Sequence, residues 1–248
     1  IVINPAHGPT TKGDCLNQLW AAMQREERRG GVRYAGIVLH DAEDWVHGEE
    51  LAVHRHYLPR HAMVQIPVVP FIPDTAAWVA GHYADEFTES HAKTLRVRHA
   101  MGGSLPAAGV GCAFDRDILH FIAQDRGGMP FSCDSLVEAY ELGLLIHEMG
   151  GRPVLAYHHG HDGALIATRA LFPTTMDTAV RQKTRWLTGI ALAGWDRMGW
   201  RGGPVEYWMR LHDRRSIIAA LVLAMGYALM LLSAVMWVVA PDAPVRNE

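Results

Sequence analysis

The sequence has few cysteines and lacks several short motifs that mark common enzyme classes. Its three cysteines are an odd number, widely spaced and without a CxxC pair, which argues against a disulfide framework and indicates reduced thiols in a cytosolic setting. No GxSxG motif and no Walker loop is present, so nothing points to a serine hydrolase or a P-loop NTPase. Internal repeats and low-complexity linkers are also missing.

Strong charge of either sign is missing as well. The net charge is −3 at pH 7, so no basic field attracts nucleic acid, and we expect no nucleic-acid partner. The length of 248 residues suits one α/β domain with a full core, plus a small additional part.

Charged residues are absent from one C-terminal stretch, Ile217–Ala240. As a helix, its roughly 24 residues would extend about 36 Å, enough to cross a hydrocarbon core of about 30 Å with some tilt. A buried helix of a soluble protein is the alternative, although this length without a charge makes it the weaker one. We predict a transmembrane helix over 217–240, preceded by an interfacial segment over 204–216 and followed by a tail over 241–248.

Positive charge precedes the predicted span: Arg210, Arg214 and Arg215 lie just before it. The positive-inside rule therefore places the preceding domain in the cytoplasm. The chain begins with Ile1–Asn4, which is typical of a strand, without a start methionine or signal peptide. We expect a piece of a larger membrane protein, with a domain over 1–203 that is truncated at its N-terminus.

The apolar run Tyr34–His40 ends at three carboxylates, Asp41, Glu43 and Asp44. This pattern predicts a buried strand that carries acids to the edge of a sheet where ligands bind. In one interpretation, Asp41 and Glu43 hold a divalent ion against a nucleotide diphosphate. In the other, the acids form an ordinary loop and Asp44 caps a helix. Short acidic triplets are common, so the motif alone does not decide.

Alternating strand and helix patterns predict an α/β fold with a mostly parallel sheet flanked by helices. A helix starts near Asp14, a suitable N-cap, and ends at Gly30–Gly31. Pro67 in the strand Met63–Val69 indicates an edge position or a bulge. The other expected elements are helices over 49–58, 78–100, 135–149 and 176–194 and strands over 107–114 and 153–157.

Several stretches form an ordered set: Gly8–Asn17, His40–Asp44, Ala108–Phe114, Asp134–Gly143 and Arg181–Trp186. Together they resemble the motifs of family-two, GT-A-fold membrane glycosyltransferases, and the chain is similar to the phage adsorption protein B family. Each motif is weak alone, but the ordered set followed by a membrane span is specific. The resemblance implies an inverting hexosyltransferase that moves a sugar from a nucleotide-diphosphate donor, a UDP-sugar, to an envelope polysaccharide.

The resemblance also implies roles for individual residues. They are Lys12, Asp14, Asp41, Gln182 and Arg185 for the donor, Trp186 and Cys112 for the acceptor, and Asp41 with Glu43 for Mg²⁺ or Mn²⁺. Arg185 can form bidentate hydrogen bonds with a pyrophosphate, and Trp186 offers a flat face to a sugar ring. Ordinary structural roles are the alternatives: Lys12 could be a solvated surface lysine, Asp14 a helix cap, and Arg185 with Trp186 a pair that braces a helix.

One position departs from the family pattern. The family's Thr-Glu-Asp motif supplies the base that takes the proton of the acceptor hydroxyl, but here it reads Val137-Glu138-Ala139. Alanine cannot accept a proton, and losing a positioned base reduces the rate by about 10²–10⁴-fold. A capping box from Ser135 explains Glu138, and a helical step of about 100° argues against Asp134 or Glu138 as a substitute. We predict a complete substrate site with impaired or absent turnover.

Two other functions remain open. A non-catalytic relative that binds a nucleotide sugar, or that scaffolds polysaccharide export, would explain Ala139. A metal hydrolase could use Asp41 and Glu43 with the histidines of 158–161, although these lack the paired spacing of zinc sites. The expected partners of the leading interpretation are a UDP-sugar, a polysaccharide acceptor, the lipid bilayer and outer-membrane export components. Its expected location is the bacterial inner membrane, with the catalytic domain in the cytoplasm.

Overall fold

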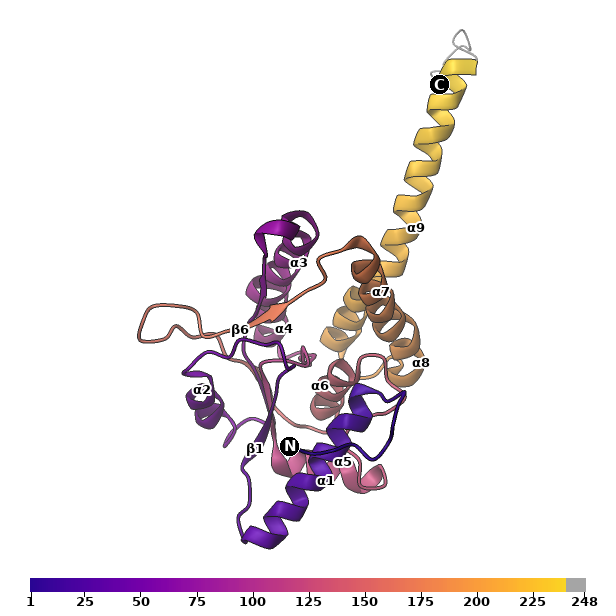
Figure 1. The fold of residues 1–248 in the computed structure, drawn as a ribbon. Coiled ribbons are helices and arrows are strands. Elements are labelled where there is room, and N and C mark those ends of the chain that lie inside the picture. The colour runs from indigo at the N-terminus through magenta and orange to yellow at the C-terminus, as the bar shows by residue number, and fades with distance from the viewer. Residues whose placement is uncertain (240–248) are drawn as a thin grey trace.

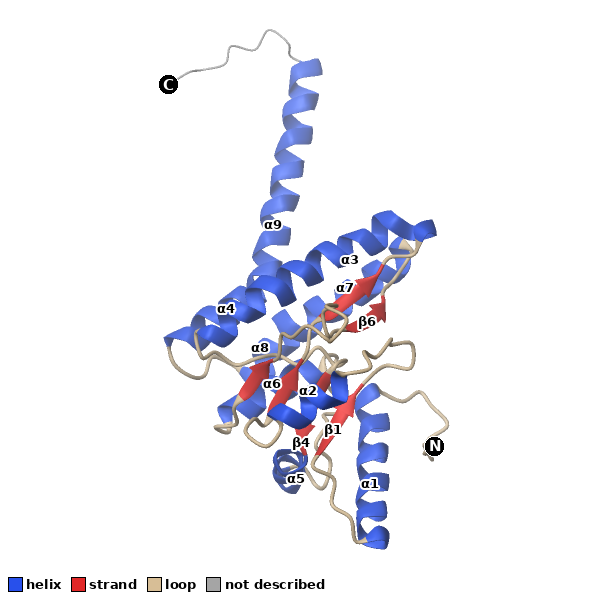
Figure 2. Ribbon diagram, turned by 90° about the vertical axis from the view of Figure 1, so that its left-hand side faces the viewer, coloured by secondary structure: helices blue, strands red, loops and turns tan. Residues whose placement is uncertain are grey.

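The computed structural model describes residues 1–239, except for the side chains of residues 76 and 77, so Ala240 and the predicted tail lie outside it. Helices surround two small sheets, and one long helix extends away from the domain (Figures 1 and 2). In chain order the elements are α1 (Lys12–Gly30), β1 (Gly36–Leu39), α2 (Glu50–Tyr57), β2 (Met63–Gln65), β3 (Val68–Phe71), η1 (Asp74–Ala76), α3 (Ala77–Glu89), η2 (Ser90–Thr94), α4 (Leu95–Ala100), β4 (Cys112–Asp115), α5 (Arg116–Asp125), α6 (Glu138–Glu148), β5 (Pro153–Leu155), β6 (Thr168–Leu171), α7 (Met176–Leu187), η3 (Thr188–Ala193), α8 (Gly194–Met198) and α9 (Pro204–Val239).

The main sheet has four strands in the order β1-β4-β2-β5, and β3 pairs with β6 in a second sheet. β4 runs antiparallel to both β1 and β2, whereas β2 with β5 and β3 with β6 are parallel pairs. The α/β class is confirmed, but the prediction of a mostly parallel sheet is wrong, because the sheet is mixed. Hydrophobic periodicity identifies a strand without fixing its direction, which depends on where the preceding connection ends.

Two predicted strands differ from the structure. Ile1–Asn4 is irregular and forms no strand. The strand predicted over Met63–Val69 is split before Pro67, which has no N–H to donate, so β2 stays in the main sheet and β3 pairs with β6. Neither β6 nor α5 was predicted from the sequence.

The start of α1 changes the role expected for Asp14. Thr11 is the N-cap: its Oγ1 accepts a hydrogen bond from the Asp14 N–H at 3.1 Å, and Asp14 Oδ2 accepts one from the Thr11 N–H at 2.9 Å. Asp14 is therefore the distal member of a capping box rather than the N-cap. Hydrogen bonds from Cys133 and Thr11 lower the pKa of Asp14. This cap places Lys12 in the first turn of α1.

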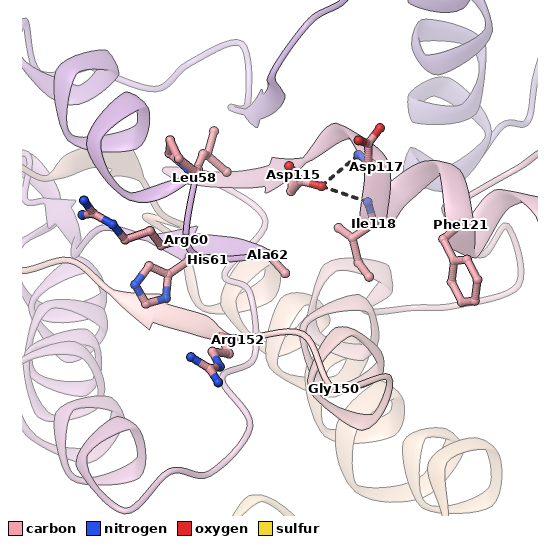
Figure 3. Close-up of a pocket in the computed structure, with 11 residues that line it drawn as sticks. Leu58, Arg60, His61, Ala62, Asp115, Asp117, Ile118, Phe121, Gly150 and Arg152 are labelled. Atoms are coloured by element: carbon pink, nitrogen blue, oxygen red, sulfur yellow. Dashed lines mark hydrogen bonds between the residues drawn. The ribbon is translucent and has the colours of Figure 1, made fainter.

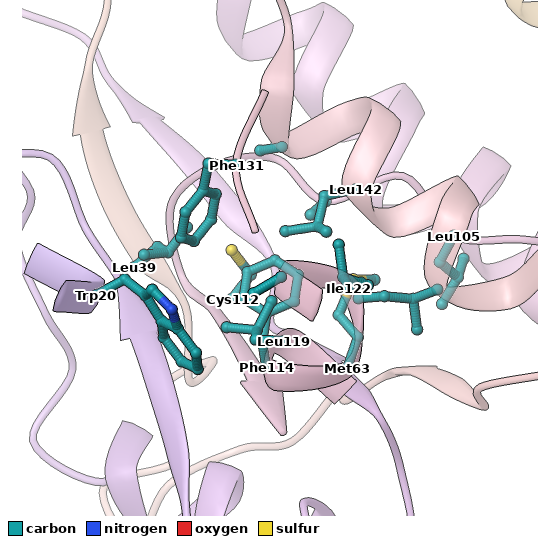
Figure 4. Packing of buried hydrophobic residues seen from close by; sticks show 14 of the residues in the cluster. Trp20, Leu39, Met63, Leu105, Cys112, Phe114, Leu119, Ile122, Phe131 and Leu142 are labelled. Carbon is teal, nitrogen blue, oxygen red and sulfur yellow. The ribbon is translucent and has the colours of Figure 1, made fainter. Parts of the chain in front are cut away.

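The main hydrophobic core lies between the four-stranded sheet and the helices α1, α5 and α6 (Figure 4). Each of these elements contributes large apolar side chains that are at most a few per cent exposed, so the sheet and its helices form one packed unit. Its members include Trp20 from α1, Cys112 and Phe114 from β4, Leu119 and Ile122 from α5, and Leu142 and Ile146 from α6.

A buried glutamine fixes the loop that precedes β4. Gln65 is 1% exposed, and its Nε2 donates to the carbonyls of Ile66, Val110 and Gly111 at 2.8, 3.0 and 3.1 Å. Its Oε1 accepts from the Ala108 N–H at 2.9 Å. One side chain thus hydrogen-bonds four backbone groups around the start of β4.

We expect Gln65→Leu to lower the free energy of unfolding by about 2–4 kcal/mol, because an apolar side chain removes the hydrogen bonds to the Ala108 N–H and the Val110 carbonyl. Thermal unfolding of the full chain in detergent, followed by circular dichroism, measures this as a lower Tm. Gln124→Leu is the matched control, since Gln124 is exposed on α5 and contacts only His120. An equal Tm for both variants would contradict the role given to Gln65.

The predicted interfacial segment and the described part of the predicted span form one unbroken helix, α9, of 36 residues. The first turns of α9 pack against the domain, with Glu206, Met209, Arg210 and Arg214 buried. From residue 218 to residue 239 every residue is exposed. Among the described residues, α9 is the one helix long and apolar enough to cross a membrane.

Two of the three arginines used to orient the span bind the domain. Arg210 and Arg214 both donate to the carbonyl of Gly199, at 3.1 and 2.8 Å, and Arg210 also pairs with Glu148. Only Arg215 is exposed. The base of α9 is therefore part of the domain, and the exposed apolar part continues rigidly from it.

Candidate functional site

A cavity of about 390 Å³ lies beside the carboxyl end of β1, between segments that are far apart in the sequence. The start of α1, the acidic loop after β1, the α3–η2 region, the loop before β4, the start of α6 and helix α7 all contribute to its wall. Eight of the ten residues expected at the site line it: Lys12, Asp41, Glu43, Glu138, Ala139, Gln182, Arg185 and Trp186.

The other two expected residues, Asp14 and Cys112, are not among the lining residues. Asp14 caps α1. Cys112 has no exposed surface, and burial raises the pKa of its thiol to about 12. A thiol sealed in the core cannot touch a substrate, which removes Cys112 from the set of acceptor contacts.

Lys12 and Asp41 form an ion pair at the cavity. Lys12 Nζ lies 2.6 Å from Asp41 Oδ1 and also donates to the carbonyl of Gly109 at 3.3 Å. Gly109 has φ +85°, and a Cβ there would lie 3.4 Å from Cβ of Ala139 and 3.6 Å from Lys12 Nζ. The loop thus passes close to both the lysine and the base position, which a glycine allows.

Asp44 is turned inward, and its side chain is 1% exposed. Its Oδ2 accepts from the Asp41 N–H at 2.8 Å and lies 3.3 Å from His40 Nδ1. His40 Nε2 is 2.7 Å from Oε1 of the buried Glu50, which also bonds His54 at 3.1 Å. Burial raises the pKa of Asp44. For Glu50, the effect of burial is outweighed by the hydrogen bonds and charges of His54 and His40, which lower its pKa.

This network decides the role of Asp44. Helix α2 begins at Glu50 and has no side-chain cap, so the alternative in which Asp44 caps the next helix is wrong. Asp44 holds the loop in place and leaves Asp41 and Glu43 as the acids available to a ligand.

The first turn of α6 carries both Glu138 and Ala139, which are 8% and 6% exposed. Its N-cap is Val137, which makes no side-chain cap, while Ser135 Oγ accepts from the Val137 N–H at 3.1 Å. The predicted capping box is therefore wrong, because the helix begins at Glu138 rather than at Ser135. The rotation of one helical step does not take Glu138 away from the site, since both side chains line the same cavity.

Helix α7 presents Gln182, Arg185 and Trp186 to the cavity on one face. Trp186 packs edge-on against Tyr83 and Phe172, with ring centroids 6.1 and 6.5 Å apart. Gln182 Oε1 is buried without a hydrogen-bond partner among the described residues. Arg185 is exposed at the cavity. The face therefore offers a cation and an aromatic ring to a ligand.

Comparison with known proteins assigns the family. The pattern of the family described as glycosyl transferase family group 2 matches residues 36–240. The chain belongs to this family. It is 33% identical over 240 residues to bacteriophage adsorption protein B of Escherichia coli K12 and to bacteriophage N4 adsorption protein B of Escherichia coli O157:H7. Both the predicted family and the similarity to phage adsorption protein B are confirmed.

The match extends over most of this chain but over a smaller part of each relative. The aligned region covers 90% of this chain and 32% of each relative, so the chain spans about a third of the length of the curated relatives it matches. Membership of the glycosyltransferase family implies transferase activity, with a sugar donor and an acceptor.

Several lining residues of this glycosyltransferase domain were not expected from the sequence. Glu86, Phe87, Ser90 and His91, from α3 and η2, form one part of the wall. His91 stacks on Phe87 with centroids 5.5 Å apart, and burial lowers its pKa to about 4. The spacing of Phe87, His91 and Leu95 could have indicated a common face, but such spacing is also typical of an ordinary core helix.

The histidine loop lies away from the glycosyltransferase cavity. His158 Nε2 is 2.7 Å from the Tyr57 hydroxyl, and His161 Nδ1 is 2.7 Å from Glu49 Oε2. Within residues 1–239, no three His, Cys, Asp or Glu side chains are grouped to hold a metal ion.

A larger, more open hollow of about 550 Å³ lies at the other edge of the sheet, where β2 and β5 begin (Figure 3). Arg60, His61 and Arg152 line one part of it, and Asp115 and Asp117 another. Asp115 caps α5 by accepting from two backbone N–H groups. None of the ten residues expected at the active site lines this hollow.

Proposed function

We propose that the chain is the glycosyl-transfer domain of an inner-membrane enzyme with a GT-A arrangement, which moves a sugar from a UDP-sugar to an envelope polysaccharide with inversion. The observation that carries the proposal is the convergence of Lys12, Asp41, Glu43, Arg185 and Trp186 on one cavity. These residues come from the two ends of the domain, and their types match a metal, a diphosphate and a sugar ring.

The charge of the cavity supports a divalent cation. Five carboxylic acids and two cationic side chains line it, so an anionic diphosphate would be repelled without further positive charge. Asp41 and Glu43 offer hard oxygen ligands at the cavity, as Mg²⁺ and Mn²⁺ prefer, and diphosphate oxygens would complete the coordination. Such an ion would neutralise charge on the leaving diphosphate.

The side chains of the protein supply the remaining functions. Lys12 and Arg185 can bind phosphate oxygens, and the planar Arg185 guanidinium can do so through two parallel hydrogen bonds. Gln182 also lines the cavity, where its side-chain amide can hydrogen-bond a sugar hydroxyl. Trp186 can pack its face against a sugar ring.

Helix α9 supports a membrane location. Its exposed apolar part continues from a base that is built into the domain, so insertion would hold the cavity at a fixed distance from the bilayer. The domain would face the cytoplasm, where nucleotide sugars are available. Export components of the outer membrane are part of the same proposal, as partners for the product.

Ala139 favours a second candidate function, a non-catalytic relative that binds a nucleotide sugar within an export assembly. The donor half of the site is complete in both functions, whereas the position of the base has no proton acceptor. Within the first proposal, Ala139 implies impaired turnover.

Binding of UDP to the full chain in detergent tests the donor site shared by both functions. Calorimetric titration in Mg²⁺ should detect binding, and Arg185→Ala should weaken it about 10- to 100-fold through loss of charge-assisted hydrogen bonds. Arg181→Ala is the matched control, because Arg181 is exposed on the same helix but does not line the cavity.

Failure of the parent chain to bind UDP in Mg²⁺ would contradict the proposal, and so would equal effects of the two arginine variants. A product assay distinguishes a transferase from a hydrolase. Release of free sugar from a UDP-sugar in the absence of an acceptor would indicate a hydrolase.

A further inference from the structure

Two π-helical segments border the cavity. The segment η2 carries the lining residues Ser90 and His91, and η3 carries Ile190. π-Helical turns are rare and frequently occur at functional sites. Segment η2 interrupts an otherwise continuous α3–α4 helix at the turn that lines the cavity.

His91, which lies in this turn, is a buried polar side chain without a hydrogen-bond partner for its Nδ1 among the described residues. The residue is 5% exposed, and its Nδ1 is sealed from solvent. Its Nε2 is not sealed in this way and also makes no hydrogen bond to the described residues, so it is the ring nitrogen that a ligand in the cavity can reach. Burial lowers its pKa to about 4, so the ring is neutral at neutral pH. Buried polar groups are nearly always hydrogen-bonded, which leaves this imidazole in a cavity wall to be explained.

The wall around His91 is aromatic. Phe87 stacks on its ring, and Phe87 in turn lies 4.6 Å from Phe172 and 6.1 Å from Trp186, centroid to centroid. A sugar ring has apolar C–H faces and a rim of hydroxyl groups. Flat apolar surface with one uncharged hydrogen-bonding group matches that chemistry.

An anion fits this part of the wall less well. Glu86 lies one residue before Phe87 and lines the same cavity, paired with Lys183. The Glu86–Lys183 pair carries no net charge and the His91 ring is uncharged, so these side chains offer a phosphate no unpaired cation, unlike Arg185 on the neighbouring helix α7. The chemistry therefore separates a saccharide part of the cavity from a diphosphate part.

We propose that His91 is a specificity-determining residue whose Nε2 hydrogen-bonds a hydroxyl group of the acceptor saccharide, with the sugar ring packed against Phe87 and Trp186. This inference rests on the proposed function, since it names the ligand of one part of the same cavity.

The test uses the full chain in detergent, saturated with UDP and Mg²⁺, and titrated calorimetrically with cellobiose or with chitobiose as probes. His91→Phe keeps a flat ring and removes both nitrogens, so affinity for the bound disaccharide should fall about tenfold. His91→Gln keeps a polar atom near Nε2 and should stay within about threefold of the parent. His82→Phe, an exposed histidine of α3 outside the cavity, is the control and should change nothing.

UDP affinity distinguishes the possible failures. If the parent binds UDP but neither disaccharide, the saccharide assignment is wrong while the proposed donor site stands. If His91→Phe binds disaccharide like the parent, or His91→Gln loses as much affinity as His91→Phe, the hydrogen bond is not the reason for the histidine. Loss of UDP binding in His91→Phe would also overturn a role restricted to the saccharide. If the parent does not bind UDP, the proposed function itself fails.

Discussion

Ala139→Asp is expected to raise the rate of sugar transfer by about 10²–10⁴-fold, because it restores a proton acceptor at the position where an inverting transferase requires its base. The measurement is product formation from a radiolabelled UDP-sugar by membranes containing the parent or variant. Several UDP-sugars are compared, since the donor sugar is part of what the assay identifies.

The structure indicates that an aspartate can serve at this position. Ala139 lies in the first turn of α6 and lines the cavity, so a longer side chain can extend toward it. The new carboxylate would lie on the same side of Gly109 as the Lys12 ammonium group, and this positive charge favours the ionised form. The N-terminal end of α6 carries a partial positive charge, which also favours an ionised carboxylate in its first turn.

Two variants make the result specific. Ala139→Asn has the same shape as the aspartate but accepts no proton, and it should show no gain over the parent. Glu138→Gln in the parent chain tests whether the neighbouring carboxylate, which lines the same cavity, supplies residual transfer. A parent that already transfers sugar as fast as Ala139→Asp would show that the base lies elsewhere, and loss of that activity in Glu138→Gln would locate it.

Glu43→Gln is expected to weaken Mg²⁺-dependent UDP binding by at least about 100-fold, since mutation of the outer-shell partners of metal ligands alone reduces affinity by about 10–100-fold. Glu43 is suited to this test because it is exposed at the cavity, whereas Asp41 also pairs with Lys12. Titration of UDP with Mg²⁺ and with EDTA measures the effect.

EDTA should reduce UDP binding of the parent to the level of Glu43→Gln and should have no further effect on that variant. Glu49→Gln is the matched control, because Glu49 lies in the same connection between β1 and α2 but pairs with His161 outside the cavity. UDP binding that is insensitive to EDTA in the parent would contradict the assignment of Asp41 and Glu43 to a metal ion.

Local sequence patterns predicted the elements better than their arrangement. Helix α1, strand β1 and helices α2, α6 and α7 lie close to where spacing and terminal residues placed them, because amphipathic periodicity and end signals are local properties. Strand Met63–Val69 was predicted as one element, but Pro67 directs its two halves into different sheets. The direction of β4 was not predictable from its own residues.

The candidate site shows the same division. Ordered motifs led to Lys12, Asp41, Glu43, Arg185 and Trp186, since their residue types carry recognisable chemistry even before folding. His91 has no such motif, and only its place in a cavity wall separates it from an ordinary core histidine. Cys112 belongs to the motif Ala108–Phe114, but its side chain points from strand β4 into the hydrophobic core.

By itself, the sequence determined that this chain joins an acidic strand-end loop, a Gln-x-x-Arg-Trp helix and a long uncharged helix. It also determined that residue 139, where the family resemblance predicts a base, is an alanine. Those properties are determined by residue identity and spacing. Only the tertiary structure decided the partners of these carboxylates: Asp44 is held in a buried network and Asp41 pairs with Lys12, while Glu43 is exposed at the cavity. The physical reason is that burial and hydrogen-bond partners come from segments distant in the chain, and these decide what a carboxylate can do.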